Sequence, residues 1–319
     1  MYKWKTYGDV TRFRVKVLCT SALVTLSCYI FHRYLLSTPG RVSVNAYEGP
    51  IAPLTVYDAH TPLERVGSAR DGGYVIARLP KTAYDAFISG GIRGNTSFEN
   101  AWAKVYELPR EDGIVEPSGV AFDGSVLEIP PLPQNIQFLS EMIGFGTSTS
   151  VCVKNTASDD NCVTRDVPTN DLGHILMKHR DAFVKLDIEG SEWAWLAQAP
   201  SSWLSRIKQM TLEFHEMGSA TGDITATDKL NILAKLTLSH VLIWAHANNH
   251  TGYDVVAGYP VPSTLEMTWI RRDVIPRGKS PVRASSPVPG PLDSPNNGAS
   301  PELYMDHRPW RCHGIECRD

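Results

Sequence analysis

Three acids stand within six residues in the stretch FVKLDIEGSEW, residues 183–193. Asp187, Glu189 and Glu192 follow an apolar run that is typical of a buried strand, and a glycine and two tryptophans stand beside them. One acid would be enough for a solvated turn. Carboxylates that end a strand can instead accept a proton from a substrate or bind a divalent cation. The spacing therefore indicates a chemical site at the end of this strand.

Histidines follow two other apolar runs and could act as bases beside these acids. His215 is near the end of IKQMTLEFHE (207–216), and His246 is near the end of HVLIWAHANN (240–249). The ordinary pKa of histidine suits proton transfer near neutral pH. A histidine that only orders a loop is the alternative at both positions. The candidate catalytic bases are Asp187, His215 and His246.

Further polar residues at the same strand ends could contact a substrate. We expect substrate hydroxyls to be bound by Glu189, Glu213, Asn248 and Asn249. Glu192 and Trp193 are expected to be structural and to open the helix that follows. Two carboxylates and an imidazole could also hold a divalent metal, although we do not expect one. Its ligands would be Asp187, Glu213 and His215.

A glycine-rich turn, SGGIRGNTSFE (89–99), is the clearest indication of a ligand. Glycines let the backbone approach a ligand closely in front of a helix N-terminus. Asp123 ends the next predicted strand, where an acid can bind both hydroxyls of a ribose. It could also be an ordinary turn aspartate before Gly124. The candidate cofactor-binding residues are Gly90, Gly91, Gly94 and Asp123.

Alternating strands and helices must position these residues. The sequence predicts strands within 84–91, 118–125, 135–144, 182–190, 207–216, 240–249 and 263–272. It predicts helices within 97–108, 169–179 and 225–238. This alternation indicates an α/β fold around a mostly parallel sheet, whose last two strands form an antiparallel pair at one end. Ligands bind outside the carboxyl ends of such strands, so all candidate residues are expected at one edge.

The N-terminus contains an uncharged apolar run, residues 17–31, with basic residues in front of it. We expect a cytosolic tail (1–14), a transmembrane signal anchor (15–36) and a stem with little structure (37–61). A cleaved signal peptide and a buried helix are the alternatives. This predicts a single-pass type II protein whose main domain lies in the lumen of the Golgi or endoplasmic reticulum.

The rest of the chain divides by composition. Residues 62–275 are expected to form the folded domain, and the Pro/Ser/Gly-rich residues 276–319 a disordered tail. Cys152/Cys162 and Cys312/Cys317 are close pairs that favour disulfides, with the connectivity left open. The net charge of −3 on 319 residues gives no indication of nucleic-acid binding. The oligomeric state is not indicated.

Six segments occur in one order along residues 70–273: RDGGYVIA, ISGGIRGNTSFE, VAFDGS, VKLDIEGSEW, LEFHE and HANN with LEMTWIRRD. In this order they resemble the FkbM-type S-adenosylmethionine-dependent methyltransferases, especially the eukaryotic membrane-anchored branch. RDGGYV alone would also fit a hairpin turn, although we prefer a loop that packs near the cofactor.

The resemblance implies a Rossmann-like seven-stranded methyltransferase domain, S-adenosylmethionine as methyl donor, and O-methylation of a glycan or another small hydroxylated acceptor. It implies that the three glycines line the methionine side of the cofactor, that Asp123 holds its ribose, and that DIEGSE lies at the acceptor side. The chain departs from the family at Arg93-Gly94-Asn95, where many relatives carry an acidic or asparagine-rich turn.

Two other functions remain open from the sequence. A type II membrane glycosyltransferase would have the same anchor, stem and domain, but it would need a D-x-D metal motif after a strand. The nearest acidic pair, Asp159-Asp160, follows no clear strand. A catalytically inactive methyltransferase-like domain that binds a ligand or partner is the other alternative, because the glycine turn is altered.

Overall fold

The computed structural model describes residues 49–109, 118–126, 128, 131–153, 163–286 and 288–311. The chain divides into two compact units, residues 1–44 and 45–319, and all described residues belong to the second. The expected cytosolic tail, the signal anchor and residues 37–48 of the stem lie outside the described residues. Within the described ranges, no helix is both long and apolar enough to cross a membrane.

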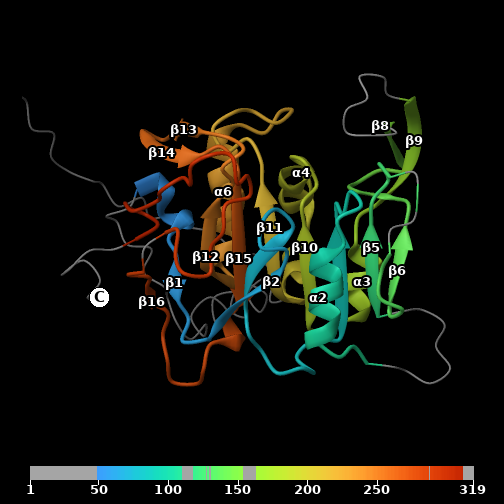
Figure 1. Cartoon of the computed structure of the whole chain (residues 1–319), viewed down its shortest axis with the longest axis horizontal. Coiled ribbons are helices and arrows are strands. Elements are labelled where there is room, and N and C mark those ends of the chain that lie inside the picture. Colours follow the sequence, from blue (N-terminus) through green and yellow to red (C-terminus); the bar gives the residue numbers. More distant parts are fainter. Residues whose placement is uncertain are drawn as a thin grey trace, which may run out of the picture. The chain divides into compact units, whose positions relative to one another are not determined.

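Seven strands form the central sheet, in the order β12-β15-β11-β10-β4-β5-β6 (Figure 1). β15 is antiparallel to both of its neighbours, and the other neighbouring pairs are parallel. The α/β, Rossmann-like prediction is confirmed, including the reversed strand at one end. The bounds are β4 (Ala86–Gly90), β5 (Gly119–Phe122), β6 (Ile136–Leu139), β10 (Ala182–Leu186), β11 (Ile207–Phe214), β12 (His240–Ala247) and β15 (Leu265–Arg271).

Helices cover both faces of this sheet because its strands are apolar on both sides. Successive side chains of a strand point to opposite faces, so Phe87 and Phe183 join one core while Ile88 and Val184 join the other. The first core includes α2 (Ser97–Val105), and the second includes the remaining helices. These are α3 (Gly173–Lys178), α4 (Ser191–Gln198), α5 (Ser201–Leu204) and α6 (Ala226–Thr237).

The segment RDGGYV forms a hairpin turn and also reaches the candidate site. β2 (Leu63–Gly67) pairs with β3 (Gly73–Ala77), and the turn between them contains Asp71 and Gly72. Both residues line the cavity described below. The hairpin interpretation is confirmed, and the position of the turn at the cavity leaves the expected contact with a cofactor as a prediction.

The stem prediction is wrong for residues 49–61. They form the 3-10 helix η1 (Gly49–Leu54) and the short strand β1 (Tyr57–Asp58), and Ile51 and Leu54 are buried in the core. The glycine and the prolines of this region belong to the packed 3-10 helix η1 rather than to an extended linker. The folded domain therefore begins before residue 62.

The prediction of a disordered tail is wrong for the described residues 276–286 and 288–311. After η2 (Arg272–Val274), β16 (Val282–Arg283) pairs with β1, and Met305 and Trp310 are fully buried. The low apolar content of this segment cannot build a core by itself. It packs because the sheet already offers an apolar surface for its few large side chains. Cys312 and Cys317 lie outside the described residues.

Two smaller sheets flank the carboxyl edge. One contains β7 (Met142–Ile143), β9 (Val163–Asn170) and β8 (Ser148–Val153), and Cys152 within it is disulfide-bonded. Cys162, the other member of this close pair, lies outside the described residues.

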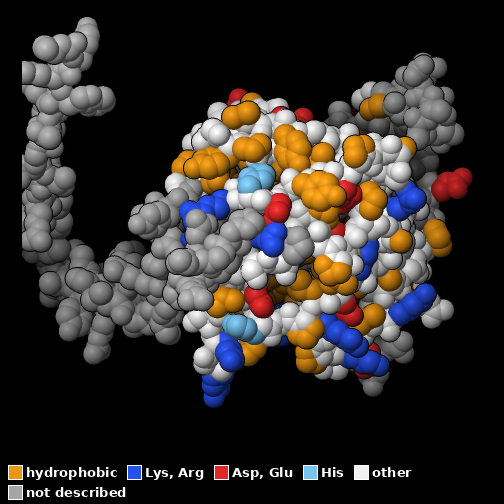
Figure 2. All heavy atoms as spheres, turned by 60° about the vertical axis from the view of Figure 1, so that its left-hand side comes forward, with side chains coloured by type: hydrophobic (Ala, Val, Ile, Leu, Met, Phe, Trp, Pro, Cys, Tyr) orange, Lys and Arg blue, Asp and Glu red, His pale blue; other side chains and the backbone are white. Residues whose placement is uncertain are grey.

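The other small sheet is the hairpin of β13 (Tyr253–Val256) and β14 (Tyr259–Pro262). Hydrophobic side chains gather on the face of the molecule that carries this hairpin (Figure 2). Tyr253, Val255, Tyr259 and Tyr304 are exposed, and none of the four lines the cavity.

Candidate active site

A cavity of about 580 Å³ lies at the carboxyl ends of the central strands. It spans the point where the strand order reverses, between β4 and β10, which is the usual ligand site of an open α/β sheet. Residues that follow five of the central strands reach it, as expected from the sequence. They include Gly91, Asp123, Asp187, His215 and Asn248, and Met142 of β7 lines the cavity as well.

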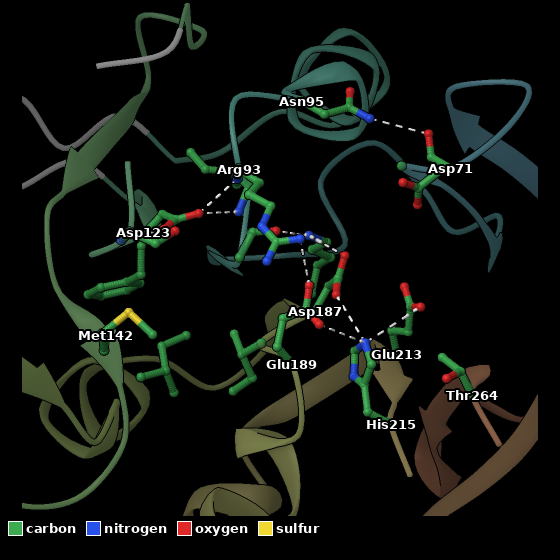
Figure 3. Close-up of a pocket in the computed structure, with 18 of the residues that line it drawn as sticks. Asp71, Arg93, Asn95, Asp123, Met142, Asp187, Glu189, Glu213, His215 and Thr264 are labelled. Carbon is green, nitrogen blue, oxygen red and sulfur yellow. Dashed lines mark hydrogen bonds and ion pairs between the residues drawn. The ribbon is translucent and has the colours of Figure 1, made fainter. Parts of the chain in front are cut away.

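At one end of the cavity, Asp123 holds the glycine turn in place (Figure 3). Its Oδ2 accepts hydrogen bonds from the backbone N–H groups of Ile92 (3.1 Å) and Arg93 (2.8 Å). Its Oδ1 accepts from the backbone N–H (2.8 Å) and the hydroxyl (2.6 Å) of Ser125. A carboxylate offers about four acceptor positions, so a ribose hydroxyl could bind here only in exchange for one of these bonds.

The three glycines of the turn have different places. Gly91 lines the cavity at a φ of +71°, and a Cβ added there would lie 1.6 Å from the backbone oxygen of Asp187. Gly90 lies within β4, against Ile143, and Gly94 faces open space. Neither Gly90 nor Gly94 lines the cavity. Gly91 is therefore the glycine that this site requires.

Lys185 also positions the turn, and sequence reasoning missed it. Its ammonium group is almost fully buried and donates to the backbone oxygens of Gly91 (2.7 Å) and Gly90 (3.3 Å). Asp187 lies 3.9 Å away. The lysine inside the apolar run FVKL could have indicated this role. A lysine in a buried strand is almost never fully buried unless it has polar partners.

The other end of the cavity is acidic and surrounds His215 (Figure 3). The Nε2 atom of His215 lies 3.6 Å from Glu189 Oε2, 3.8 Å from Glu213 Oε1 and 4.0 Å from Asp187 Oδ1. Arg93 from the glycine turn reaches across and pairs with Glu189 at 2.9 Å. The structure therefore brings together Asp187, Glu189, Glu213 and His215, as the sequence predicted.

Glu192 fixes the orientation of the histidine ring. It is fully buried in the first turn of α4, and its Oε1 lies 3.0 Å from His215 Nδ1. The same carboxylate accepts hydrogen bonds from the backbone N–H groups of His215 and Gly190. The structural role expected for Glu192 is confirmed, and it leaves Nε2 of His215 pointing toward the cavity.

The acids change the proton affinity of His215. Burial lowers its pKa, but the hydrogen bond and charge of Glu192, followed by the charges of Glu213 and Asp187, raise it to about 9. Burial raises the pKa of Glu213 well above its usual range, and the charge of Asp187 adds to this. His215 is therefore protonated near neutral pH and has no free lone pair with which to act as a base there.

His246 lies outside the cavity, so its prediction as a catalytic base is wrong. Its side chain is fully buried, 3.2 Å from Glu266 and 2.5 Å from Glu302. Glu302 belongs to the C-terminal segment that was expected to be disordered. The His246 ring stacks on Trp244, and its contact with Glu302 places it in a site that the C-terminal segment closes.

Asn249 is also turned away from the cavity, and its prediction as a substrate-binding residue is wrong. Its side-chain amide donates to the backbone oxygens of Asn297 (2.8 Å) and Ser300 (3.0 Å). Asn248 does line the cavity and donates to Glu213 at 2.7 Å. His250 and Thr251, which sequence reasoning missed, line it as well.

No protein-family model matches this chain. A search of curated proteins likewise gives no match. The resemblance to FkbM-type methyltransferases therefore stays a prediction carried by the motifs and their order.

Proposed function

We propose that this protein is an S-adenosylmethionine-dependent O-methyltransferase that acts on a hydroxyl group of a glycan or another small hydroxylated acceptor. One observation carries the proposal. A glycine turn, an apolar wall and an acidic end follow one another in a single cavity at the carboxyl edge of a seven-stranded sheet. This is the arrangement that the resemblance implies for the cofactor and acceptor sides.

The turn and the apolar wall fit a nucleoside cofactor. Phe122, Met142, Ile143 and Ile188 give the cavity an apolar side beside the turn, which suits a flat adenine ring. Gly91 would let the backbone approach the methionine part of the cofactor. Asp123 would act mainly by holding the turn, and Ser125 places a hydroxyl beside it.

The acidic end fits the other half of the reaction. S-adenosylmethionine supplies a methyl group on a positively charged sulfur, which becomes a neutral thioether when the methyl group is transferred to oxygen. The carboxylates of Asp187, Glu189 and Glu213 favour a positive charge near them. They are also hydrogen-bond acceptors for the hydroxyls of an acceptor. Because the donor is already activated, positioning of the two reactants supplies much of the rate.

A carboxylate, rather than a histidine, would take the proton that the hydroxyl loses. Asp187 and Glu189 reach the cavity with side chains that are 24% and 57% exposed. His215 is already protonated, so its positive charge would attract the neighbouring carboxylates and hold them in place. This assigns Asp187 and Glu189 as the proton acceptors and His215 as a positioning residue.

The proposed setting is the lumen of the secretory pathway. Disulfides persist mainly in oxidising compartments, and Cys152 is disulfide-bonded. This supports the expected signal anchor at residues 15–36 and the Golgi or endoplasmic reticulum as the location.

Calorimetry on the purified full-length protein tests the proposal. We expect binding of S-adenosylmethionine and S-adenosylhomocysteine, and stabilisation by about 2.7 kcal/mol at roughly 100 times the dissociation constant. Asp123→Ala should lose this binding because the glycine turn loses two hydrogen bonds and Ser125 beside it loses two more. Asp223→Ala, an exposed loop residue, is the matched control.

Absence of binding to a well-folded protein would contradict the proposal. It would favour a catalytically inactive domain that binds a different ligand. Equal binding by Asp123→Ala and the control would instead move the cofactor away from the glycine turn.

A further inference from the structure

We propose that Asp187, Glu213 and His215 bind a divalent metal ion at the acidic end of the cavity. Each offers one ligand atom, and these atoms all lie within 4.8 Å of one another. Asp187 directly follows β10, Glu213 is near the end of the neighbouring strand β11, and His215 follows it (Figure 3). Two carboxylates and one imidazole favour a cation such as Mn²⁺ or Mg²⁺ over softer metals.

The distances around His215 fit coordination better than direct hydrogen bonding. Its Nε2 lies 3.8 Å from Glu213 and 4.0 Å from Asp187, beyond the ~3.2 Å limit of an N–H···O hydrogen bond. Two ligands that are each about 2.1 Å from one ion lie about 3.0 Å apart at a right angle and about 4.2 Å apart when opposite. The two separations from Nε2 lie between these values, and the ligand atoms of Asp187 and Glu213 lie within 4.8 Å of each other.

Each of the three side chains is held by a partner that is not itself a ligand. Glu192 holds His215 through Nδ1 at 3.0 Å. Asn248 donates to Glu213 at 2.7 Å, and the Tyr74 hydroxyl donates to Asp187 Oδ2 at 3.2 Å. A carboxylate on the second ring nitrogen is the usual support of a metal-binding histidine. His215 Nε2 and Asp187 Oδ1 both face the cavity. Because His215 is protonated in the absence of a metal, binding of the ion would displace the proton from Nε2.

The charges at this end also favour a cation. Asp187, Glu189, Glu192 and Glu213 place four carboxylates around one imidazole. Within the described residues, Arg93 pairs with the outermost of them, Glu189, and Lys185 is 3.9 Å from Asp187. Once the ion displaces the His215 proton, these carboxylates would stabilise its positive charge between Asp187, Glu213 and His215.

The catalytic role of this ion rests on the proposed function, whereas its binding does not. The ion would polarise the acceptor hydroxyl, as metals do for bound water. Glu189 is not needed as a ligand, so its carboxylate would take the hydroxyl proton. The oxygen lone pair would form the new bond to the methyl carbon, and the electron pair of the broken carbon–sulfur bond would stay on sulfur. Asp187 would then act as a ligand rather than as a proton acceptor.

Electron paramagnetic resonance with Mn²⁺ tests the site directly. The full-length protein is dialysed against a chelator and then against buffer. Mn²⁺ is then added in steps, and the resonance signal of the free ion is measured after each addition. We expect one bound Mn²⁺ per chain. Glu213→Gln should weaken binding at least tenfold, because it removes a charged ligand but keeps the shape of the side chain. Glu192→Gln should weaken it about 10- to 100-fold through the ring of His215.

Glu216→Gln is the matched control, because this exposed acid follows His215 directly but does not line the cavity. It should leave Mn²⁺ binding unchanged. S-adenosylmethionine binding by each variant reports that the domain is folded, and near-ultraviolet circular dichroism does so without a ligand.

The two proposals fail in different ways. Mn²⁺ bound through Glu213 without any S-adenosylmethionine binding would keep the metal site and contradict the methyltransferase. S-adenosylmethionine binding to a protein that leaves Mn²⁺ free would overturn the metal site alone. Mn²⁺ binding that is equal in wild type, Glu213→Gln and Glu216→Gln would overturn it as well, because the ion would then lie elsewhere.

Discussion

Two histidines in this protein are each surrounded by acids, and only one of them lies in the cavity. His246 is sealed between Glu266 and Glu302, at 3.2 and 2.5 Å. His215 has one bonded acid, Glu192, while the acids that face its Nε2 stay at 3.6 Å or more. In both, nearby carboxylates raise the pKa to about 9. The same pKa therefore arises in two different environments.

The two histidines differ in how many of their ring nitrogens have a direct hydrogen-bond partner. Both ring nitrogens of His246 have direct partners, so the ring has no nitrogen left for a ligand, and it joins the C-terminal segment to β12 and β15. One ring nitrogen of His215 faces a cavity where no acid is close enough to bond it directly. A perturbed pKa marks functional sites only with a certain probability, because structural ion pairs produce the same shift. Geometry separates the two cases here.

Removing the C-terminal segment should break the sealed cluster completely. A chain ending at Ser286 loses Glu302 and the buried side chains of Met305 and Trp310. Each of these large side chains contributes about 1.5–3 kcal/mol by burial, and an unpaired buried charge costs about 3–5 kcal/mol. The sum approaches the whole stability of a typical domain. We expect an unfolded or protease-sensitive product, measured by circular dichroism and limited proteolysis.

A chain ending at Arg311 is the matched control for this truncation, because it keeps every contact of the described segment. A protein ending at Ser286 that unfolds at the same urea concentration as this control would contradict the stabilising role of the segment.

Single substitutions should separate the two histidines. His246→Ala should lower the free energy of unfolding by about 3–5 kcal/mol, because Glu266 and Glu302 lose a buried partner. His215→Ala should cost only about 1 kcal/mol, because Glu192 keeps its bonds from the backbone N–H groups of residues 190 and 215. Urea denaturation measures both values. Equal losses would show that the two clusters are equally structural.

The pH dependence of stability should involve both clusters. The folded-state pKa of about 9 lies above the ordinary value of 6.5 for His246 and for His215. Each histidine therefore contributes stability that is fully present below pH 6.5 and is lost as the pH rises through about 9. The groups that face His246 are Glu266, Glu302 and Asp293, and those that face His215 are Glu192, Glu213, Asp187 and Glu189.

Thermal unfolding between pH 6.5 and 9.5 checks this dependence. The melting temperature of the wild type should fall across this range. His246→Gln should flatten the profile more than His215→Gln, because His246 is the more deeply buried of the two. A wild-type profile that is level or rises across this range would contradict the protonated state of both histidines.

The sequence alone determined the order of the elements and the edge at which the polar residues meet. Apolar runs such as AFVKL and IKQMTLEF predicted the central strands correctly. The spacing of apolar residues is a local property, so it can be read from neighbouring positions in the sequence. Asp187, Glu213 and His215 could be placed together because the ends of neighbouring strands in an α/β sheet share one edge. The antiparallel pairing of the last two strands, β12 and β15, was also predicted.

Only the tertiary structure decided what each polar side chain contacts. His246 and Asn249 were expected in the site, yet their partners, Glu302 and Ser300, come from a segment more than fifty residues later in the chain. The composition of that segment indicated disorder, because it cannot form a core alone. It folds against a surface that other residues build. Burial and hydrogen-bond partners depend on residues that are distant in sequence, and these decided which histidine faces the cavity.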